Sequence, residues 1–237
     1  VRFAERHRAL GIGQIGWHSY LQSKMIPFES MEAKLLNVKI AKTIKEQAYA
    51  ASAKVALDYG EPEVCKGYGR RNSTLIAIAP TKSSAFIIGQ SSEAIEPERT
   101  NYFIKDLQKG KHTVKNRFLE KLLKEKDMDN EEIWLDILKH GGSVQHLEFL
   151  NDKEKSVFKT FGEISQKEVI IQAAQRQKYI DQGQSLNLMI HPSIPTKDVN
   201  SLMIEGWKLG IKSYYYQYSV NAAQAFSRDL LQCASCQ

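Results

Sequence analysis

The sequence predicts an α/β domain in which parallel strands are separated by helices. Short apolar runs typical of buried strands alternate with longer stretches whose apolar residues recur at three- and four-residue steps. The composition supports a packed core, since 42% of the 237 residues are apolar and 25% are charged. No repeat or low-complexity linker divides the chain, so one domain is expected, with too few strands to close a sheet on their own.

The predicted elements follow in order from residue 31. Apolar side chains at helical spacing predict a helix over 31–59, which Gly60 and Pro62 end. A loop rich in glycine and arginine (65–72) leads into the short buried strand "STLIAIAP" (73–80). The remaining elements are helices near 115–126, 130–140 and 152–160 within a polar region at 99–160, a helix at 166–181, a strand at 185–190, a helix opened by Thr196 and Asp198, and a strand at 211–217.

The net charge of +6 invites a nucleic-acid interpretation, but few aromatic residues lie among the basic ones. A solvated helical face better explains the densest basic run, which comprises Lys109, Lys111, Lys115, Arg117, Lys121, Lys124 and Lys126. No stretch approaches the roughly 18 apolar residues of a membrane span, and the charged start "VRFAERHRAL" is unlike a signal peptide. We therefore expect a cytoplasmic protein without nucleic-acid or membrane partners. The charge is still compatible with substrates or effectors that bear phosphates.

The stretch "GIGQIG" (11–16) matches the glycine pattern of dinucleotide-binding folds. That fold needs a buried strand before the glycines and an acidic residue at the end of a second strand. "RFAERHRA" is not such a strand, and Glu32 opens a helix. Close backbone packing is therefore the favoured explanation of these glycines.

The stretch "APTKSSAF" (79–86) is the first candidate site. A predicted strand ends at Pro80, and Thr81, Ser83 and Ser84 follow where a helix or tight turn would expose unpaired backbone N–H groups. Hydroxyls and free N–H groups after a strand can cradle a phosphate. Plain N-capping by Thr81 or Ser83 explains the same residues.

The terminal stretch "CASCQ" (233–237) is the second candidate. A Cys-x-x-Cys pair can close a disulfide, hold half of a metal site, or carry electrons as a dithiol, and it can also be two unimportant thiols. A metal site needs two further ligands, and His140 and His146 are not at ligand spacing from each other. We therefore predict no metal site.

Three consecutive tyrosines, Tyr214, Tyr215 and Tyr216, are the third candidate. In a regular strand Tyr214 and Tyr216 would share one face and Tyr215 the other, although adjacent phenols can come close where a strand ends or twists. Aromatic residues are frequent in strands, so packing alone can explain them. A chain of phenols can also pass an oxidising equivalent by coupled loss of an electron and a proton.

Together and in this order, the motifs resemble the C-terminal part of the large, catalytic subunit of class I ribonucleoside-diphosphate reductases. The resemblance rests on "LGIGQIGWHSYL" (10–21), "RNSTLIAIAPTKSS" (71–84), "IEPERTNYFIK" (95–105), "YIDQGQSLNLMI" (179–190), "KLGIKSYYYQ" (208–217) and the terminal cysteine pair.

The resemblance implies a fold and a substrate loop. The family fold is a ten-stranded α/β barrel of two halves, of which 1–220 would supply most of the second half, with helical insertions, and 221–237 a flexible redox-active tail. The substrate diphosphate would be held by Pro80, Thr81, Lys82, Ser83 and Ser84. Lys82 replaces an acidic or small residue common in this loop, a change that would strengthen anion binding.

The resemblance also implies two redox elements. Tyr215 and Tyr216 match the tyrosine pair that relays a radical from the small, metal-containing subunit, with Tyr216 towards that subunit and Tyr215 towards the catalytic cysteine. Tyr214 matches an ordinary apolar residue and is assigned to packing. Cys233 and Cys236 match the tail dithiol that re-reduces the active-site disulfide and is itself reduced by thioredoxin or glutaredoxin.

Other family elements are expected outside this chain. The radical-bearing cysteine, the two cysteines oxidised in each turnover and the region that senses ATP and deoxynucleotide effectors would precede it. Cys65 matches none of these and is interpreted as structural. The chain would bind no cofactor, because the metal-radical cofactor belongs to the small subunit. Its partners would be the N-terminal part of the large subunit, the small subunit, thioredoxin or glutaredoxin, and a ribonucleoside diphosphate.

The predicted function is the C-terminal component of an enzyme that reduces ribonucleoside diphosphates for DNA synthesis and that works only with its N-terminal part and small subunit. A split reductase of a virus or phage, acting in the host cytoplasm, would suit such a chain. The alternative is a catalytically incomplete remnant retained to bind the small subunit. The intact tyrosine and cysteine pairs argue against a remnant, since binding requires neither.

Overall fold

The computed structural model describes residues 1–89, 91–107 and 110–219. Its helices are α1 (Arg2–His7), α2 (Trp17–Ser23), α3 (Met31–Tyr59), α4 (Lys82–Gly89), α5 (Arg117–Glu125), α6 (Glu131–Lys139), α7 (Asp152–Val157), α8 (Gln166–Gln177) and α9 (Thr196–Lys208), with a 3-10 turn, η1 (Glu63–Cys65). Its strands are β1 (Tyr102–Leu107), β2 (Gly110–Lys115), β3 (Leu188–Met189) and β4 (Gln217–Tyr218). The predicted helices are therefore confirmed, with ends that differ by a few residues.

Extended segments from distant parts of the sequence pair in parallel, as predicted. Strands β3 and β4 are parallel neighbours. Isolated parallel bridges join Ile12 to Ile76 and Ile78 to Gln184. The segments near 12, 76–78, 184–189 and 217–218 thus follow one another across a single curved layer, which is not closed within the described residues.

The predicted strands at 73–80, 185–190 and 211–217 are much shorter than expected. Side chains take the place of a neighbouring strand for several of their amides. The Asp181 carboxylate accepts hydrogen bonds from the Leu75 amide at 2.8 Å and the Ile76 amide at 2.9 Å. The Asn187 side chain accepts one from the Tyr216 amide at 2.8 Å, and β4 begins only at the next residue.

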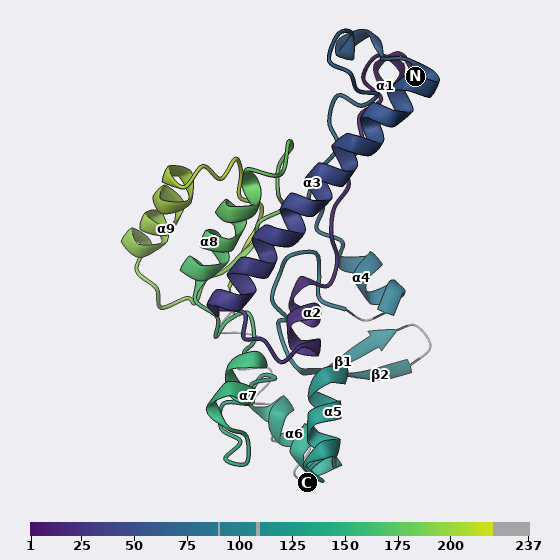
Figure 1. Cartoon of the computed structure of the whole chain (residues 1–237). Coiled ribbons are helices and arrows are strands. Elements are labelled where there is room, and N and C mark those ends of the chain that lie inside the picture. The colour runs from purple at the N-terminus through teal and green to yellow at the C-terminus, as the bar shows by residue number, and fades with distance from the viewer. Residues whose placement is uncertain (90, 108–109, 220–237) are drawn as a thin grey trace.

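Helices α3 and α8 pack side by side, and α9 lies beyond α8 (Figure 1). Small buried residues of α3, among them Ala33, Ala41 and Ala48, allow a close approach to its neighbours. The Lys34 ammonium lies 2.7 Å from the Glu168 carboxylate across the α3–α8 contact. The main core beneath these helices includes Trp17, Leu21, Phe28, Leu75, Ile78, Ile95, Phe161, Ile170, Leu186, Leu188 and Ile211.

The polar region predicted at 99–160, called the insertion from here on, forms a substructure with its own core. Helices α5, α6 and α7 gather at the lower end of the molecule beside the β1–β2 hairpin (Figure 1). This insertion core comprises Tyr102, Leu119, Leu122, Leu123, Trp134, Ile137, Val144, Leu147, Leu150, Val157 and Phe158. The antiparallel hairpin was not expected from the sequence, because "YFIKDL" and "GKHTVK" are rich in charged and polar residues and lack a clean apolar alternation.

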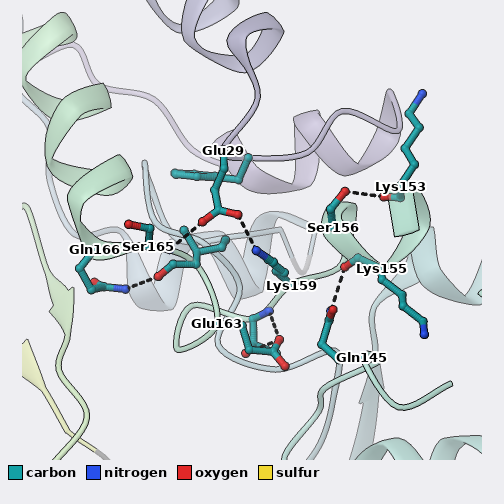
Figure 2. Close-up of polar contacts among 12 residues, drawn as sticks. Glu29, Gln145, Lys153, Lys155, Ser156, Lys159, Glu163, Ser165 and Gln166 are labelled. Atoms are coloured by element: carbon teal, nitrogen blue, oxygen red, sulfur yellow. Dashed lines mark hydrogen bonds and ion pairs between the residues drawn. The ribbon is translucent and has the colours of Figure 1, made fainter. Parts of the chain in front are cut away.

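One carboxylate joins the insertion to the main layer (Figure 2). Glu29, just before α3, accepts a hydrogen bond from the Lys159 ammonium at 2.7 Å and another from the Ser165 amide at 2.8 Å. Lys159 follows α7 and Ser165 precedes α8, so Glu29 fixes the point where the chain leaves the insertion. The insertion is therefore attached by specific polar contacts as well as by its two chain connections.

The basic run behaves as a solvated surface where the structure describes it. Lys115, Lys121, Lys124 and Lys126 each lie within 4 Å of an acidic side chain. Among the described residues, no helix is both long and apolar enough to cross a bilayer.

Candidate functional site

The candidate residues adjoin two segments that pair in parallel with the same central segment, one after its paired residue and one before it. Ile78 pairs with Gln184, and Gln217 pairs with Leu188. The stretch 79–84 follows the Ile78 bridge, and Tyr215 and Tyr216 lead directly into β4. The β layer therefore links the two predicted sites through the segment 184–189, which pairs with both of their strands.

The loop at 80–84 ends in helix α4, as the sequence suggested. Lys82, Ser83 and Ser84 form the first turn of this helix, and all three are exposed. Within the described part of the chain, no side chain bonds the amides of these three residues, which a helix leaves without intrahelical partners. The loop thus offers free amides, two hydroxyls and an ammonium group on one accessible surface.

Thr81 has a structural task at the start of this loop. Its φ of 52° lies in the left-handed region that non-glycine residues seldom adopt. Its hydroxyl accepts a hydrogen bond from the Ala94 amide at 2.9 Å, which ties the loop to the stretch 91–96. The Thr81 hydroxyl is therefore not simply the cap of α4.

Tyr215 and Tyr216 lie against each other on the surface. Their ring centroids are 4.1 Å apart with an interplanar angle of 54°, and about half of each side chain is exposed. The neighbouring Tyr216 side chain raises the pKa of Tyr215. The Tyr218 ring follows at 6.0 Å from Tyr216.

Tyr214 lies apart from this pair. It is partly buried against the main core, and its hydroxyl donates to the Leu202 carbonyl of α9 at 3.1 Å. The rule that Tyr214 and Tyr216 share a face does not apply, because residues 211–216 are not a regular strand. Packing is thus the role that the contacts support for Tyr214.

Buried polar groups hold the backbone of the tyrosine pair. The Asn187 side chain accepts from the Tyr216 amide and donates to the Glu96 carboxylate. The Tyr215 amide donates to the Leu186 carbonyl at 2.9 Å. Burial raises the pKa of Glu96 to about 7, with the hydrogen bond from Asn187 opposing the shift.

An arginine adjoins the third ring. The Arg99 guanidinium carbon lies 3.8 Å from the centroid of the Tyr218 ring, within the range of a cation–π contact. Arg99 also approaches Glu93 at 3.4 Å and Glu96 at 3.5 Å. The motif "IEPERTNY" thus places a carboxyl group, Glu96, and a guanidinium group, Arg99, beside the tyrosines.

A buried histidine is hydrogen-bonded to the backbone of the same motif. His18 of α2 is fully buried and accepts a hydrogen bond at Nδ1 from the Glu98 amide, at 2.8 Å. Burial lowers the pKa of His18 to about 3, so the ring is neutral at physiological pH. Burial also raises the pKa of Glu98 to about 7.

Other sequence predictions meet different outcomes. Cys65 is buried, with 1% of its surface exposed, which agrees with a structural role. The glycine-rich stretch 11–16 packs closely as expected, since a Cβ on Gly13 would lie 2.8 Å from the Ala77 carbonyl oxygen. Cys233 and Cys236, and the tail at 221–237, lie outside the described residues.

Sequence reasoning missed two sets of residues. Asn187 and Glu96 stand out only as members of longer motifs, because a supporting polar pair leaves no spacing signal. His140 and His146 are not at ligand spacing in the sequence, yet their rings stack with centroids 3.6 Å apart. The signal that could have found them is Asp136, which lies one helical turn before His140.

Comparisons with known proteins give one consistent family. The model of the ribonucleotide reductase barrel domain matches residues 2–64 and 61–217. A ribonucleoside-diphosphate reductase large subunit of Invertebrate iridescent virus 6 is 42% identical over 229 residues, which cover 95% of this chain and 24% of that protein. The large subunit of Danio rerio is 36% identical over 245 residues, covering 90% of this chain and 30% of that protein.

A solved structure agrees in fold. The Actinobacillus ureae class Id ribonucleotide reductase alpha subunit superposes with a TM-score of 0.88 and 57% identity, covering 95% of this chain and 41% of that one. The chain therefore spans less than half the length of each of these proteins. From its sequence, its parallel layer and these matches, the chain belongs to the ribonucleotide reductase family and carries part of that family's barrel domain.

Proposed function

We propose that the chain is the C-terminal component of a ribonucleoside-diphosphate reductase large subunit and forms half of the catalytic barrel. In this proposal it reduces ribonucleoside diphosphates by a radical mechanism, together with the N-terminal part of the large subunit and the small subunit. The observation that carries it is the single layer in which the loop at 80–84 and the tyrosine pair both flank the segment 184–189.

The loop at 80–84 would hold the substrate diphosphate. The first amides of α4 point out of the helix N-terminus, where the partial positive charge of a helix favours anions. The Ser83 and Ser84 hydroxyls can donate further hydrogen bonds, and the Lys82 ammonium adds a full positive charge. Backbone amides can orient a phosphate by themselves, so the loop does not need further charged side chains.

The tyrosine pair would carry the radical. A neutral tyrosyl radical at Tyr216 takes one electron and one proton from the Tyr215 hydroxyl, which leaves a closed-shell Tyr216 and a radical at Tyr215. The support for this transfer is the ring contact, with centroids 4.1 Å apart, which brings the two phenols together for passage of the electron and the proton. The oxidant would be the metal-radical cofactor of the small subunit, and the next acceptor the catalytic cysteine of the N-terminal part.

The tail dithiol would complete each cycle. Two thiols of the substrate site become a disulfide when the substrate is reduced, and Cys233 with Cys236 would reduce that disulfide by thiol–disulfide exchange. The tail disulfide that results would be reduced by thioredoxin or glutaredoxin. The support for this role is the Cys-x-x-Cys spacing in the sequence.

A chimera tests the proposal. This chain replaces the matched part of the Actinobacillus ureae alpha subunit, with which it is 57% identical, and formation of deoxyribonucleoside diphosphate is measured with the small subunit present. We expect activity from the chimera and none from the 237-residue chain with the small subunit alone. A folded chimera that binds the small subunit but makes no product would instead favour the catalytically incomplete binding remnant.

A further inference from the structure

A cluster of two histidines and one aspartate lies in the insertion, outside the proposed reductase site. Asp136 lies on α6, and His140 follows one helical turn later, directly after the end of the helix. His146 comes after a short turn. The Oδ2 atom of Asp136 lies 2.8 Å from Nε2 of His146, and Oδ1 lies 3.3 Å from Nδ1 of His140. One ligand atom from each residue can be chosen so that all three lie within 4.8 Å of one another.

Two glycines bring the second histidine back to the helix. Gly141 and Gly142 have φ values of 67° and 88°, which side chains other than glycine rarely adopt. The Gly142 amide donates to the Ile137 carbonyl at 2.8 Å, which ends α6 in a tight reversal. The chain then returns with Val144 buried in the insertion core, so that His146 stacks on His140.

The Asp136 carboxylate is the shared side-chain partner of the two imidazoles, with Oδ1 near His140 and Oδ2 near His146. Nδ1 of His146 is buried and has no hydrogen-bonding partner among the described residues. Both rings therefore depend on Asp136 for their polar contacts to side chains.

We propose that Asp136, His140 and His146 form a binding site for a divalent transition-metal ion, of which Zn²⁺ fits best. Two imidazole nitrogens and one carboxylate oxygen are a ligand set that proteins use for Zn²⁺, with a fourth position left for water. The site does not depend on the proposed reductase activity. Its ion would fasten the turn after α6 to the helix and so stabilise the insertion.

The two rings must turn out of their stack so that one nitrogen of each points at a shared ion. Bonds of about 2.0–2.2 Å in a tetrahedron place ligand atoms roughly 3.3–3.6 Å apart, and one ligand atom from each of the three residues already lies within 4.8 Å of the others. The ion would enter between the carboxylate and the rings and replace their direct contacts. Access is open, because the side chains of Asp136 and His140 are 40% and 50% exposed.

Metal titration of the full chain tests the site. The chain is prepared without an affinity tag and with Cys233→Ser and Cys236→Ser in every sample, because the tail thiols would otherwise bind Zn²⁺. Calorimetry with Zn²⁺ measures the stoichiometry, and the visible absorbance of Co²⁺ reports the geometry. We expect one ion per chain, a tetrahedral Co²⁺ spectrum and a higher unfolding temperature with Zn²⁺.

Substitutions within the cluster then identify the ligands. His140→Ala and His146→Ala should each weaken binding by more than about 100-fold, since even outer-shell changes cost about 10–100-fold. His191→Ala is the matched control, because His191 is exposed and bonds Ser193 outside the cluster; it should bind like the parent. Asp136→Asn keeps the size of the side chain and should weaken binding while circular dichroism stays unchanged.

Equal affinity in the parent and the His140→Ala/His146→Ala double variant would overturn the proposal. A parent chain that shows no saturable Zn²⁺ binding would overturn it as well, whether or not the variants fold.

Discussion

Gly206 of α9 has no side chain, and the Tyr214 ring occupies the space beside it. Gly206→Ala therefore tests whether this packing of Tyr214 against α9 stabilises the chain. A Cβ at this position would overlap the Tyr214 hydroxyl oxygen and lie 2.7 Å from its Cζ atom. Non-bonded carbon atoms are best separated by about 3.5–4.0 Å, so the ring must retreat by roughly 1 Å or more. Tyr214 would then lose its hydrogen bond to the Leu202 carbonyl.

The magnitude follows from opposing contributions. Overpacking costs about 1–3 kcal/mol, and the lost hydrogen bond costs about 0.5–1.5 kcal/mol. Replacing a helical glycine with alanine returns up to about 1 kcal/mol. We therefore expect Gly206→Ala to lower the free energy of unfolding by about 1–3 kcal/mol, measured by urea denaturation and circular dichroism.

The sign of the effect should depend on Tyr214. In a Tyr214→Ala background the two nearest atoms are gone, and the next is the tip of the flexible Ile211 side chain, at 3.3 Å. Gly206→Ala should then stabilise the chain by up to about 1 kcal/mol. Equal destabilisation in both backgrounds, or stabilisation in the parent, would show that the Tyr214 ring does not depend on the space beside Gly206.

Three further predictions concern the buried groups and the tail. The His18 pKa of about 3 lies below its ordinary value of 6.5, so between pH 7 and pH 5 the imidazole binds a proton only in the unfolded chain. The free energy of unfolding should therefore fall by about 2 kcal/mol over this range on account of His18, and urea titrations of His18→Gln should lack that fall. Asn187→Ala leaves the Tyr216 amide and a buried carboxyl without their partner, and should lower the free energy of unfolding by about 2–4 kcal/mol in urea; an unchanged unfolding midpoint would contradict the positioning role. Cys233→Ser or Cys236→Ser in the chimera should stop thioredoxin-driven multiple turnovers but spare one turnover from pre-reduced enzyme, and continuous turnover in both variants would exclude the shuttle role.

The helices and the direction of strand pairing could be predicted from local pattern. Ser30 caps α3 through the Ala33 amide at 3.1 Å, and Gly60 ends the helix with a φ of 73°, as the sequence signals suggested. Parallel pairing followed from the alternation of apolar runs with helices. The extent of the strands could not be predicted, because the Asp181 and Asn187 side chains replace ladder contacts over long sequence separations.

The candidate site divides in a similar way. The loop at 80–84 and the tyrosines stand out because hydroxyls after a strand and consecutive phenols are unusual patterns. The contact between Tyr215 and Tyr216 depends on an irregular backbone that strand periodicity does not describe. The Asp136–His140–His146 cluster depends on the reversal at Gly141 and Gly142, which spacing between the histidines alone does not indicate.

Product formation by Tyr216→Phe in the chimera shows whether the adjacent phenols at Tyr215 and Tyr216 carry a radical. Phenylalanine keeps the ring and its packing but has no hydroxyl to lose a proton and an electron. Tyr214→Phe is the matched control, because it removes one hydroxyl that bonds the Leu202 carbonyl and leaves the Tyr215–Tyr216 pair intact. We expect no deoxyribonucleoside diphosphate from Tyr216→Phe, with substrate binding retained, and nearly full activity from Tyr214→Phe. Parent-level turnover by Tyr216→Phe would rule out a radical relay through Tyr216.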